Sequence, residues 1–268
     1  MSRQGIRQAP TREFDISMTT TTAKGDMEAA PIGELEVSIW RGGEDGGVQT
    51  FTVPHYESQT VLDVVTWVQQ TLDASLSYRF SCRVGMCGSC AMTVNGRPRW
   101  TCRTHVSRVA SGSELEIRPL RNLPIIKDLV VDMAPFFDKW RNGRGYFEPS
   151  RPGSLTVAPV DTNSEARQQA SAAIECIGCA VCHAACDVVA WQPGYLGPAA
   201  LNRAWTLIND ERDSERRGHL AAVAGAGGCH GCHSTGSCAS HCPNSLNPTA
   251  AIAGLKREVT KAMLKGKL

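Results

Sequence analysis

Twelve cysteines gathered in short runs constrain this chain of 268 residues more than any other feature. Within each run the cysteines are separated by only two to four residues, whereas a disulfide framework usually spreads its cysteines along a small secreted chain. Residues 1–32 lack the apolar centre of a secretory signal, and we interpret them as a disordered leader. We therefore expect a protein that is not exported and whose thiols hold metal.

Charge and hydropathy exclude two further classes of protein. The chain has 28 basic and 26 acidic side chains, and its formal net charge of +2 gives no electrostatic bias toward nucleic acid. An apolar run of about 18 residues, the length that spans a membrane, is absent. Lys127, Asp128 and Asp132 interrupt the best candidate, residues 124–137. The sequence therefore predicts neither a nucleic-acid partner nor a membrane-spanning segment.

Alternating apolar and polar residues predict a small sheet packed on one helix in residues 33–123. The dipeptide Asn95-Gly96 between two alternating segments is a strong hairpin signal, because both residues tolerate the positive φ angles of a tight turn. The expected elements are strands at 35–40 and 48–53, a helix at 61–72 capped by Ser58 or Thr60, a hairpin at 91–102 and a strand at 114–118.

Strand signals stop after Pro124, and apolar residues then recur at helical spacing. A connection rich in glycine and proline interrupts this pattern at residues 142–159. The expected helices cover residues 125–140, 164–175, 197–210, 214–224 and 248–264. We therefore expect an α+β protein, with a sheet domain at residues 33–123 and an all-helical domain at residues 124–268.

The first group of cysteines lies in the predicted sheet domain. Its spacing, C-x4-C-x2-C with a fourth cysteine after a hairpin, is that of plant-type ferredoxins that hold a [2Fe-2S] cluster. Glycines permit a close approach of the backbone, so that amides near Gly85, Gly88 and Ser89 can point at the sulfurs. A four-thiolate zinc site is the alternative, although such sites normally use paired C-x2-4-C knuckles. The expected ligands are Cys82, Cys87, Cys90 and Cys102.

An internal repeat carries the second group of cysteines. The run C-x2-C-x2-C-x3-C begins at Cys176, and it recurs from Cys232 with Thr235 in the second position and Pro243 after the last cysteine. In bacterial two-cluster ferredoxins the fourth cysteine of a run binds the other cluster. The same crossing predicts a [4Fe-4S] cluster here, held by Cys176, Cys179, Cys182 and Cys242.

The remaining cysteines of the repeat predict a third cluster that lacks one corner. The hydroxyl of Thr235 at the missing position is a much weaker iron ligand than a thiolate. A [3Fe-4S] cluster is therefore expected, held by Cys186, Cys232 and Cys238. Cys229 lies outside the repeat, and we interpret it as a bystander; if it reached the open corner, the third cluster would be a cubane.

Around these cysteines the chain resembles the iron–sulfur subunit of succinate dehydrogenase and fumarate reductase, over residues 33 to 265. The motifs that carry the resemblance are the loop at 81–90, an expected interdomain helix at 124–132, and segments of the helical domain at 196–201 and 242–248. The resemblance implies a β-grasp, plant-type ferredoxin domain followed by an all-α domain that is similar to bacterial two-cluster ferredoxins.

The resemblance also implies partners and a location. Electrons would pass singly between the FAD of a partner flavoprotein and membrane quinone, with the substrate chemistry confined to the flavoprotein. Membrane anchor subunits, with or without haem b, would complete the complex. The chain would then be a peripheral protein on the cytoplasmic face of the membrane, or on the matrix face in a mitochondrion.

Two residues match the family's quinone pocket. Trp191 could donate its indole N–H to a quinone oxygen, and His233 could adjust the charge of the cluster through protonation. The alternatives are an aromatic residue of an interface and a hydrogen-bond donor near the cluster. Two other functions also stay open, namely a related fumarate reductase subunit that uses a thiol or soluble electron donor, and a zinc-stabilised binding module.

Overall fold

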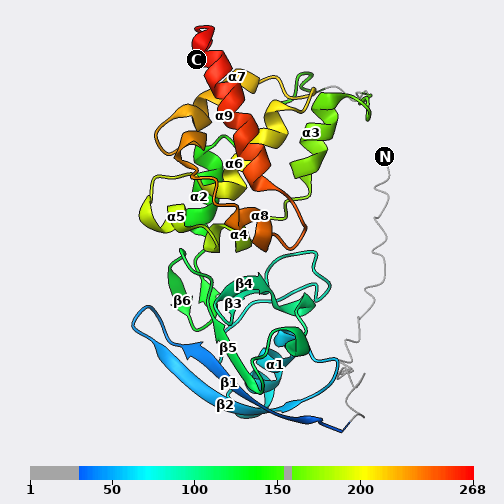
Figure 1. Cartoon of the computed structure of the whole chain (residues 1–268), viewed down its shortest axis with the longest axis vertical. Helices are drawn as coiled ribbons and strands as arrows, with labels where there is room; N and C mark the ends of the chain where they lie inside the picture. The colour runs from blue at the N-terminus through cyan, green and yellow to red at the C-terminus, as the bar shows by residue number, and fades with distance from the viewer. Residues whose placement is uncertain (1–29, 154–158) are drawn as a thin grey trace, which may run out of the picture. The chain divides into compact units, whose positions relative to one another are not determined.

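The computed structural model describes residues 30–153 and 159–268 of the chain (Figure 1). The leader predicted for residues 1–32 therefore lies almost entirely outside the described residues. From Pro31 to Leu268 the chain groups into one unit by its internal contacts. This unit begins with a sheet and continues as helices, so the α+β class predicted from the sequence is confirmed.

Five strands form the sheet: β1 (Gly33–Arg41), β2 (Gly47–His55), β3 (Ala91–Val94), β4 (Arg97–Trp100) and β5 (Glu114–Arg118). The order is β2-β1-β5-β3-β4, in which β1 and β5 are parallel and the other pairs are antiparallel. The φ angles of Asn95 (46°) and Gly96 (74°) are both positive, as the two-residue turn between β3 and β4 requires. The hairpin predicted at residues 91–102 is therefore confirmed, and the strands predicted at 35–40 and 48–53 pair as antiparallel neighbours.

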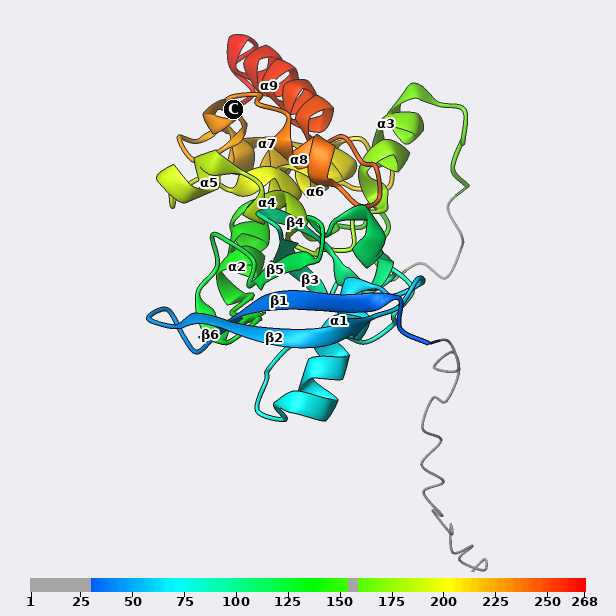
Figure 2. The ribbon, with the colours of Figure 1, turned by 60° about the horizontal axis from the view of Figure 1, so that its bottom comes forward.

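Helix α1 (Val61–Trp67) continues as a π-helical turn over Val68–Leu72 and lies on one face of the sheet (Figure 2). Thr60 begins the helix with a capping box, because its hydroxyl accepts from the amide of Asp63 and its own amide donates to the Asp63 carboxylate. The apolar stripe predicted for this helix packs with residues of β1, β2 and β5 in one buried cluster. Burial of these apolar side chains stabilises the packing of α1 on the sheet.

The helix predicted for residues 125–140 is wrong in its first half. The chain forms a small hairpin of β6 (Ile125–Lys127) and β7 (Val130–Val131), and α2 spans only Ala134–Asn142. Asp128 makes the turn with a φ of 52°, and its buried carboxylate accepts hydrogen bonds from the amides of Gly42 and Ser77. These bonds tie the segment to the sheet domain, so the motif at 124–132 is not an interdomain helix.

Helices joined by loops form the rest of the described chain, and four of the helices match the predicted ones to within two residues at each end. They are α3 (Glu165–Ile174), α4 (Val181–Ala184), α5 (Asp187–Trp191), α6 (Gly197–Ile208), α7 (Arg216–Ala224), α8 (Ser237–His241) and α9 (Pro248–Leu264). The sequence did not predict α4, α5 and α8, since helices this short carry too few residues to display periodicity. Among the described residues, no helix combines the length and apolar character needed to cross a membrane.

Helix α6 lies at the centre of the helical region, and every residue in it except Arg203 is buried. It packs against α3, α7 and α9. The approach to α9 is close enough that a Cβ at Gly254 would clash with the ring of Trp205. This packing holds the short helices and loops that carry the cysteines.

Two polar side chains connect the sheet region to the cysteine-bearing helices. Asn122 donates its side-chain amide to the carbonyls of His183 (3.0 Å) and Cys186 (3.1 Å), at the end of α4. Arg97 of β4 donates to the carbonyl of Ser240 in α8 (2.8 Å). The connections place the loop of the first cysteine group beside the segments that carry the second group.

Candidate functional site

The four cysteines of the first group lie on one loop and on the turn that follows β4. Cys82 and Cys87 are half-buried, whereas Cys90 and Cys102 are buried. The Sγ of Cys82 accepts hydrogen bonds from the amides of Met86 (3.2 Å) and Cys87 (3.3 Å). The structure therefore folds the loop around its own sulfurs, with backbone N–H groups directed at them.

Two thiols of the first group, Cys87 and Cys102, have shifted pKa values. A hydrogen bond from the Ser89 hydroxyl, followed by the Cys82 amide, lowers the pKa of Cys87 to about 6. Burial, followed by the neighbouring Cys90 thiol, raises the pKa of Cys102 to about 12. The amides of Ser89 and Gly85 also donate to Cys87 and Cys102 respectively, as the sequence predicted for these positions.

The loop depends on backbone conformations that favour glycine. Gly85 (φ 78°) and Gly88 (φ 71°) both lie in the left-handed region, and Arg83 (φ 57°) shares it. A Cβ at Gly88 would also lie 2.5 Å from the Cβ of Cys179. Gly88 is therefore the point at which the loop of the first group touches the second group of cysteines.

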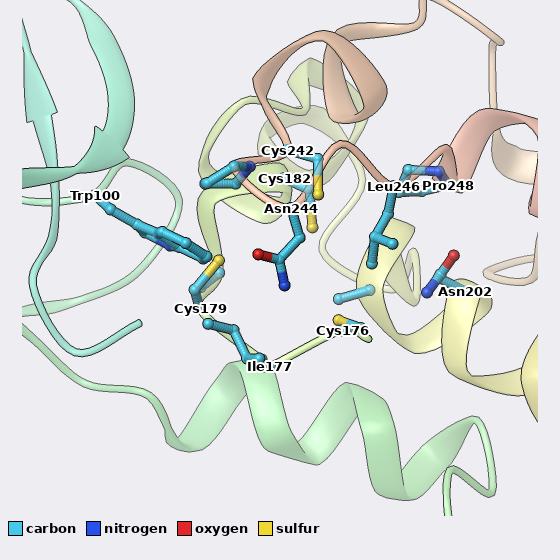
Figure 3. A pocket seen from close by; sticks show the side chains of 14 residues that line it. Trp100, Cys176, Ile177, Cys179, Cys182, Asn202, Cys242, Asn244, Leu246 and Pro248 are labelled. Atoms are coloured by element: carbon cyan, nitrogen blue, oxygen red, sulfur yellow. The ribbon is translucent and has the colours of Figure 1, made fainter. Parts of the chain in front are cut away.

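Four cysteines of the second group surround one cavity (Figure 3). They are the four that the crossed pattern predicts: Cys176, Cys179, Cys182 and Cys242. The cavity holds about 420 Å³ of empty space, including its opening to solvent. Trp100 of β4, Ile177 and Leu246 supply apolar walls. The fold therefore brings Cys242 beside the first run of cysteines, from which it is remote in sequence.

Burial makes three of these thiols poor acids. It raises the pKa of Cys179 to about 11. It also raises the pKa of Cys182 well above its ordinary value, with the neighbouring Cys179 and Cys176 adding to the effect. Burial also raises the pKa of Cys176, although the amide of Gly178 opposes it. Several thiolates cannot share so apolar a space unless cations compensate their charge, and a coordinating metal removes the thiol proton outright.

The third set of cysteines also converges. Burial is the largest cause of the raised pKa of Cys186 and of Cys238, and the neighbouring Cys232 raises both as well. Burial likewise raises the pKa of Tyr195, which contacts Cys232. The amides at the start of α5 donate to Cys186, and the hydroxyl of Thr249 lies 3.3 Å from the Cys238 Sγ.

Thr235 and Cys229 differ in their surroundings. Thr235, in the slot where the first run has Cys179, is exposed. Cys229 has no exposed surface and packs in the apolar core with Ile252 and Leu255. The core position of Cys229 agrees with its interpretation as a bystander, which stays a prediction.

Trp191 and His233 both lie at the surface. Trp191 ends α5 and is 74 % exposed, the second most exposed large apolar side chain among the described residues after Leu264. His233 directly follows Cys232 and is exposed as well. An exposed indole beside a cysteine-bearing helix is accessible to a ligand or partner, and the quinone role of both residues stays a prediction.

The donor sets fit iron–sulfur clusters. All twelve cysteines are free thiols, and soft thiolates are the ligands that iron–sulfur clusters use. Backbone amides donate to sulfur in the first and third sets, as they do around bound clusters. Within residues 30–153 and 159–268, no three or more His, Cys, Asp or Glu side chains are arranged to hold a single metal ion. A cluster makes a different demand, since its thiolates are distributed over two or more irons instead of converging on one ion.

Sequence reasoning missed several residues around the cysteines. Trp100, Tyr195, Thr249 and Asn122 approach them from β4, from the loop before α6, from α9 and from the segment after β5. None belongs to the cysteine runs, and their contacts depend on tertiary packing. Among these residues, only Trp100 could have been suspected from the sequence, because it lies two residues before the candidate ligand Cys102.

Fold and site together define an iron–sulfur protein with two kinds of cluster domain. Residues 35–138 match the family model of a 2Fe-2S iron-sulfur cluster binding domain. Residues 175–247 match the model of a 4Fe-4S dicluster domain. The two matches cover the loop of the first cysteine group and the repeat that carries the second.

Relatives identify the family. The chain is 34 % identical to the fumarate reductase iron-sulfur subunit of Mycobacterium tuberculosis, over 86 % of this chain and 94 % of that protein. It is 30 % identical to the mitochondrial succinate dehydrogenase [ubiquinone] iron-sulfur subunit of Dictyostelium discoideum, over 88 % and 90 %. A chain of the Mycobacterium smegmatis Sdh1 complex in the apo form superposes with a TM-score of 0.76 at 27 % identity, covering 85 % of this chain and 96 % of that chain.

The chain therefore belongs to the family of iron–sulfur subunits of fumarate reductase and succinate dehydrogenase. Its role is electron transfer within an oxidoreductase of this family, and the resemblance stated from the sequence is confirmed.

Proposed function

We propose that the chain passes single electrons between the FAD of a partner flavoprotein and membrane quinone, through three iron–sulfur clusters. When bound, the clusters supply one-electron redox centres, which the protein's own side chains do not. The proposed ligands are Cys82, Cys87, Cys90 and Cys102 for [2Fe-2S], Cys176, Cys179, Cys182 and Cys242 for [4Fe-4S], and Cys186, Cys232 and Cys238 for [3Fe-4S].

The observation that carries this proposal is the order of the three cysteine sets in space. Gly88 in the loop of the first set packs directly on Cys179 of the second. Cys182 of the second set lies within the short helix α4, and Cys186 of the third set follows two residues after the end of that helix. Each set therefore adjoins the next, which is the arrangement that stepwise electron transfer through the chain needs.

The protein's contribution at each set is to hold thiolates in place and to keep water out. Amides directed at the sulfurs of Cys82 and Cys232 stabilise negative charge there. Apolar walls around the second set, formed in part by Ile177 and Leu246, exclude solvent from the sulfurs. Both the hydrogen bonds and the exclusion of solvent are levers on the reduction potential of a cluster.

We assign the flavoprotein contact to the loop of the first set. Met86 is 70 % exposed and Val84 is also exposed, so two apolar side chains lie at the surface beside Cys82 and Cys87. Exposed apolar patches of this kind support contact with another protein. Dicarboxylate binding and hydride transfer belong to that flavoprotein in this proposal.

We assign quinone contact to the third set. Trp191 would donate its exposed indole N–H to a quinone oxygen, and His233 would act beside Cys232. Membrane anchor subunits, with or without haem b, would provide the rest of the pocket. The chain would then lie on the cytoplasmic face of the membrane, or on the matrix face in a mitochondrion.

The finer description of the fold is part of the same proposal. The sheet with α1 on one face supports a β-grasp, plant-type ferredoxin domain, and the repeat supports a helical domain similar to bacterial two-cluster ferredoxins. The boundary predicted near residue 124 needs a later position, because Leu129 packs in the core of the sheet domain.

Anaerobic reconstitution of the full chain with iron and sulfide tests the proposal. We expect a brown protein whose oxidised form gives a near-isotropic EPR signal close to the free-electron value, as expected for a [3Fe-4S] cluster. Reduction should then reveal the other two clusters. A chain that stays colourless and free of iron would refute the proposal. A third reducible cubane in place of the oxidised signal would instead move Cys229 into the ligand set.

A further inference from the structure

Trp100 lies between the first and second cysteine sets. It is the last residue of β4, two residues before Cys102, and only 6 % of its surface is exposed. One edge of its ring packs on the loop of the first set, because a Cβ at Gly85 would lie 3.2 Å from Cζ3 of the indole. Its other side lines the cavity that Cys176, Cys179, Cys182 and Cys242 surround.

The indole N–H of Trp100 is buried beside the second cysteine set without a partner in the described part of the chain. The Nε1 atom has no hydrogen-bond acceptor, whether oxygen or sulfur, among the described residues. An indole N–H can only donate, so its burial without an acceptor is costly. Figure 3 shows the ring extending toward the Cys179 sulfur at the wall of the cavity.

We infer that, with the [4Fe-4S] centre in place, the unpartnered indole N–H of Trp100 donates to the Cys179 Sγ while its ring supports the loop of the first set, which makes Trp100 a positioning residue of that centre. The inference rests on the proposed function, since it takes Cys179 as a ligand of that centre. A hydrogen bond to a ligand sulfur stabilises the more negative, reduced form of a cluster and so raises its reduction potential. Trp100 would thus set the potential of the second centre from within the domain that holds the first.

The substitution Trp100→Phe removes the N–H and keeps an aromatic ring. The substitution should shift the equilibrium between the reduced and oxidised forms of the [4Fe-4S] centre about fivefold toward the oxidised form. Loss of one ordinary hydrogen bond changes an equilibrium constant by about this factor. A fivefold change equals about 41 mV at 59 mV per tenfold for one electron. The measurement is an EPR-monitored redox titration of the reconstituted full chain, with the [2Fe-2S] potential recorded in the same sample.

Trp40→Phe is the matched control. Its indole N–H donates to the carbonyl of Gly43, 3.2 Å away in the turn between β1 and β2. Removing that donor should leave the [4Fe-4S] potential unchanged, because the turn contributes no residue to the cavity. An equal shift in both variants would mean that the effect is general, and it would overturn the inference.

A second measurement uses the wild-type protein alone. When it is grown with isotope-labelled indole nitrogen, it should display a magnetic coupling between that nitrogen and the reduced [4Fe-4S] centre. Absence of this coupling would overturn the role of Trp100. An unchanged [4Fe-4S] potential in a Trp100→Phe protein with full iron and sulfide content would overturn it as well. Neither result would affect the proposed function. Absence of iron from the wild type would instead overturn the proposed function.

Discussion

Replacing Gly88 with alanine tests whether the loop of the first cysteine set lies against Cys179. An added methyl group would lie 2.5 Å from the Cβ and 3.0 Å from the Cα of Cys179. Real Cβ atoms do not approach one another so closely, so either the loop or the Cys179 backbone must move. Gly88→Ala also places a side chain on a residue with a φ of 71°.

The magnitude follows from these two effects. A left-handed backbone costs a residue other than glycine about 1–2 kcal/mol. Overpacking in a well-packed region costs about 1–3 kcal/mol more. We therefore expect Gly88→Ala to lower the free energy of unfolding by about 2–5 kcal/mol, and to lower the amount of cluster that the protein retains.

Gly96→Ala separates the two effects. Gly96 has a similar φ of 74°, but an added Cβ there meets no atom within 4 Å. Gly96→Ala should therefore show only the backbone cost. The difference between the variants, about 1–3 kcal/mol, corresponds to about 2–12 °C in apparent Tm at about 2–4 °C per kcal/mol.

The assay is thermal unfolding of the reconstituted protein at one fixed scan rate, with iron and sulfide measured on the same samples. Fixed conditions are needed because a protein with bound clusters does not unfold in two states. A Gly88→Ala protein as stable as Gly96→Ala, with full cluster content, would refute the close contact between the two sets.

Three further predictions concern the other sites. Trp191→Leu should reduce quinone-linked activity of the assembled complex while leaving dye-linked succinate oxidation nearly intact, because the indole N–H is lost and the clusters are not. Thr249→Val should lower the potential of the third centre by removing the hydroxyl 3.3 Å from the Cys238 Sγ, whereas Thr249→Ser should retain the wild-type value in the same EPR titration. Asp128→Asn should lower the free energy of unfolding at neutral pH by about 1–3 kcal/mol, measured by denaturant titration, because it weakens hydrogen bonds to a buried carboxylate.

The Asp128 prediction has a defined pH dependence. Burial alone would raise the pKa of this carboxyl, but hydrogen bonds from the Gly42 and Ser77 amides and from Arg41 hold it below its ordinary value of 3.8. A lowered folded pKa means that the stabilisation is present above pH 3.8 and is lost as the pH falls through the folded value. The stability difference between wild type and Asp128→Asn should therefore shrink in acid.

The predictions for Trp191 and Thr249 can each be contradicted by one result. Equal losses in the quinone and dye assays would place Trp191 outside the quinone pocket and would favour a thiol or soluble electron donor. An unchanged potential in Thr249→Val would mean that the hydroxyl does not donate to Cys238.

Local rules were sufficient to predict most of the sheet. Asn95-Gly96 specified its hairpin because two positive φ angles in sequence suit few other residue types. The stripe from Val61 to Val68 specified a helix because its period matches one buried face. In both cases the determining interactions lie within a few residues, so the sequence pattern carries them.

The same local rules gave a wrong prediction for the segment after Pro124. Its branched apolar residues recur at intervals that suit a helix, yet Ile125, Val130 and Val131 pair as strands. The deciding interactions are the hydrogen bonds of Asp128 to Gly42 and Ser77, which are remote in sequence. Tertiary contacts of this kind override a weak local preference.

Cysteine spacing predicted a part of the candidate site that local structure alone could not, namely the approach of cysteines that are remote in sequence. The repeat predicted that Cys242 would join the first run, and the structure brings it to the same cavity. Spacing could not predict which side chains approach the sulfurs from elsewhere. Trp100 and Thr249 reach Cys179 and Cys238 only through packing between distant elements.

Helix α4 has a consequence for how the protein matures. Cys182 lies within this single turn and Cys186 lies two residues beyond it, and the side chain of Asn122 holds the carbonyls at its end. A displaced Cys182 would therefore move Cys186 as well. With these two residues as the proposed ligands of different clusters, oxidative damage at the second centre should extend to the third, and the two centres should be gained and lost as a pair.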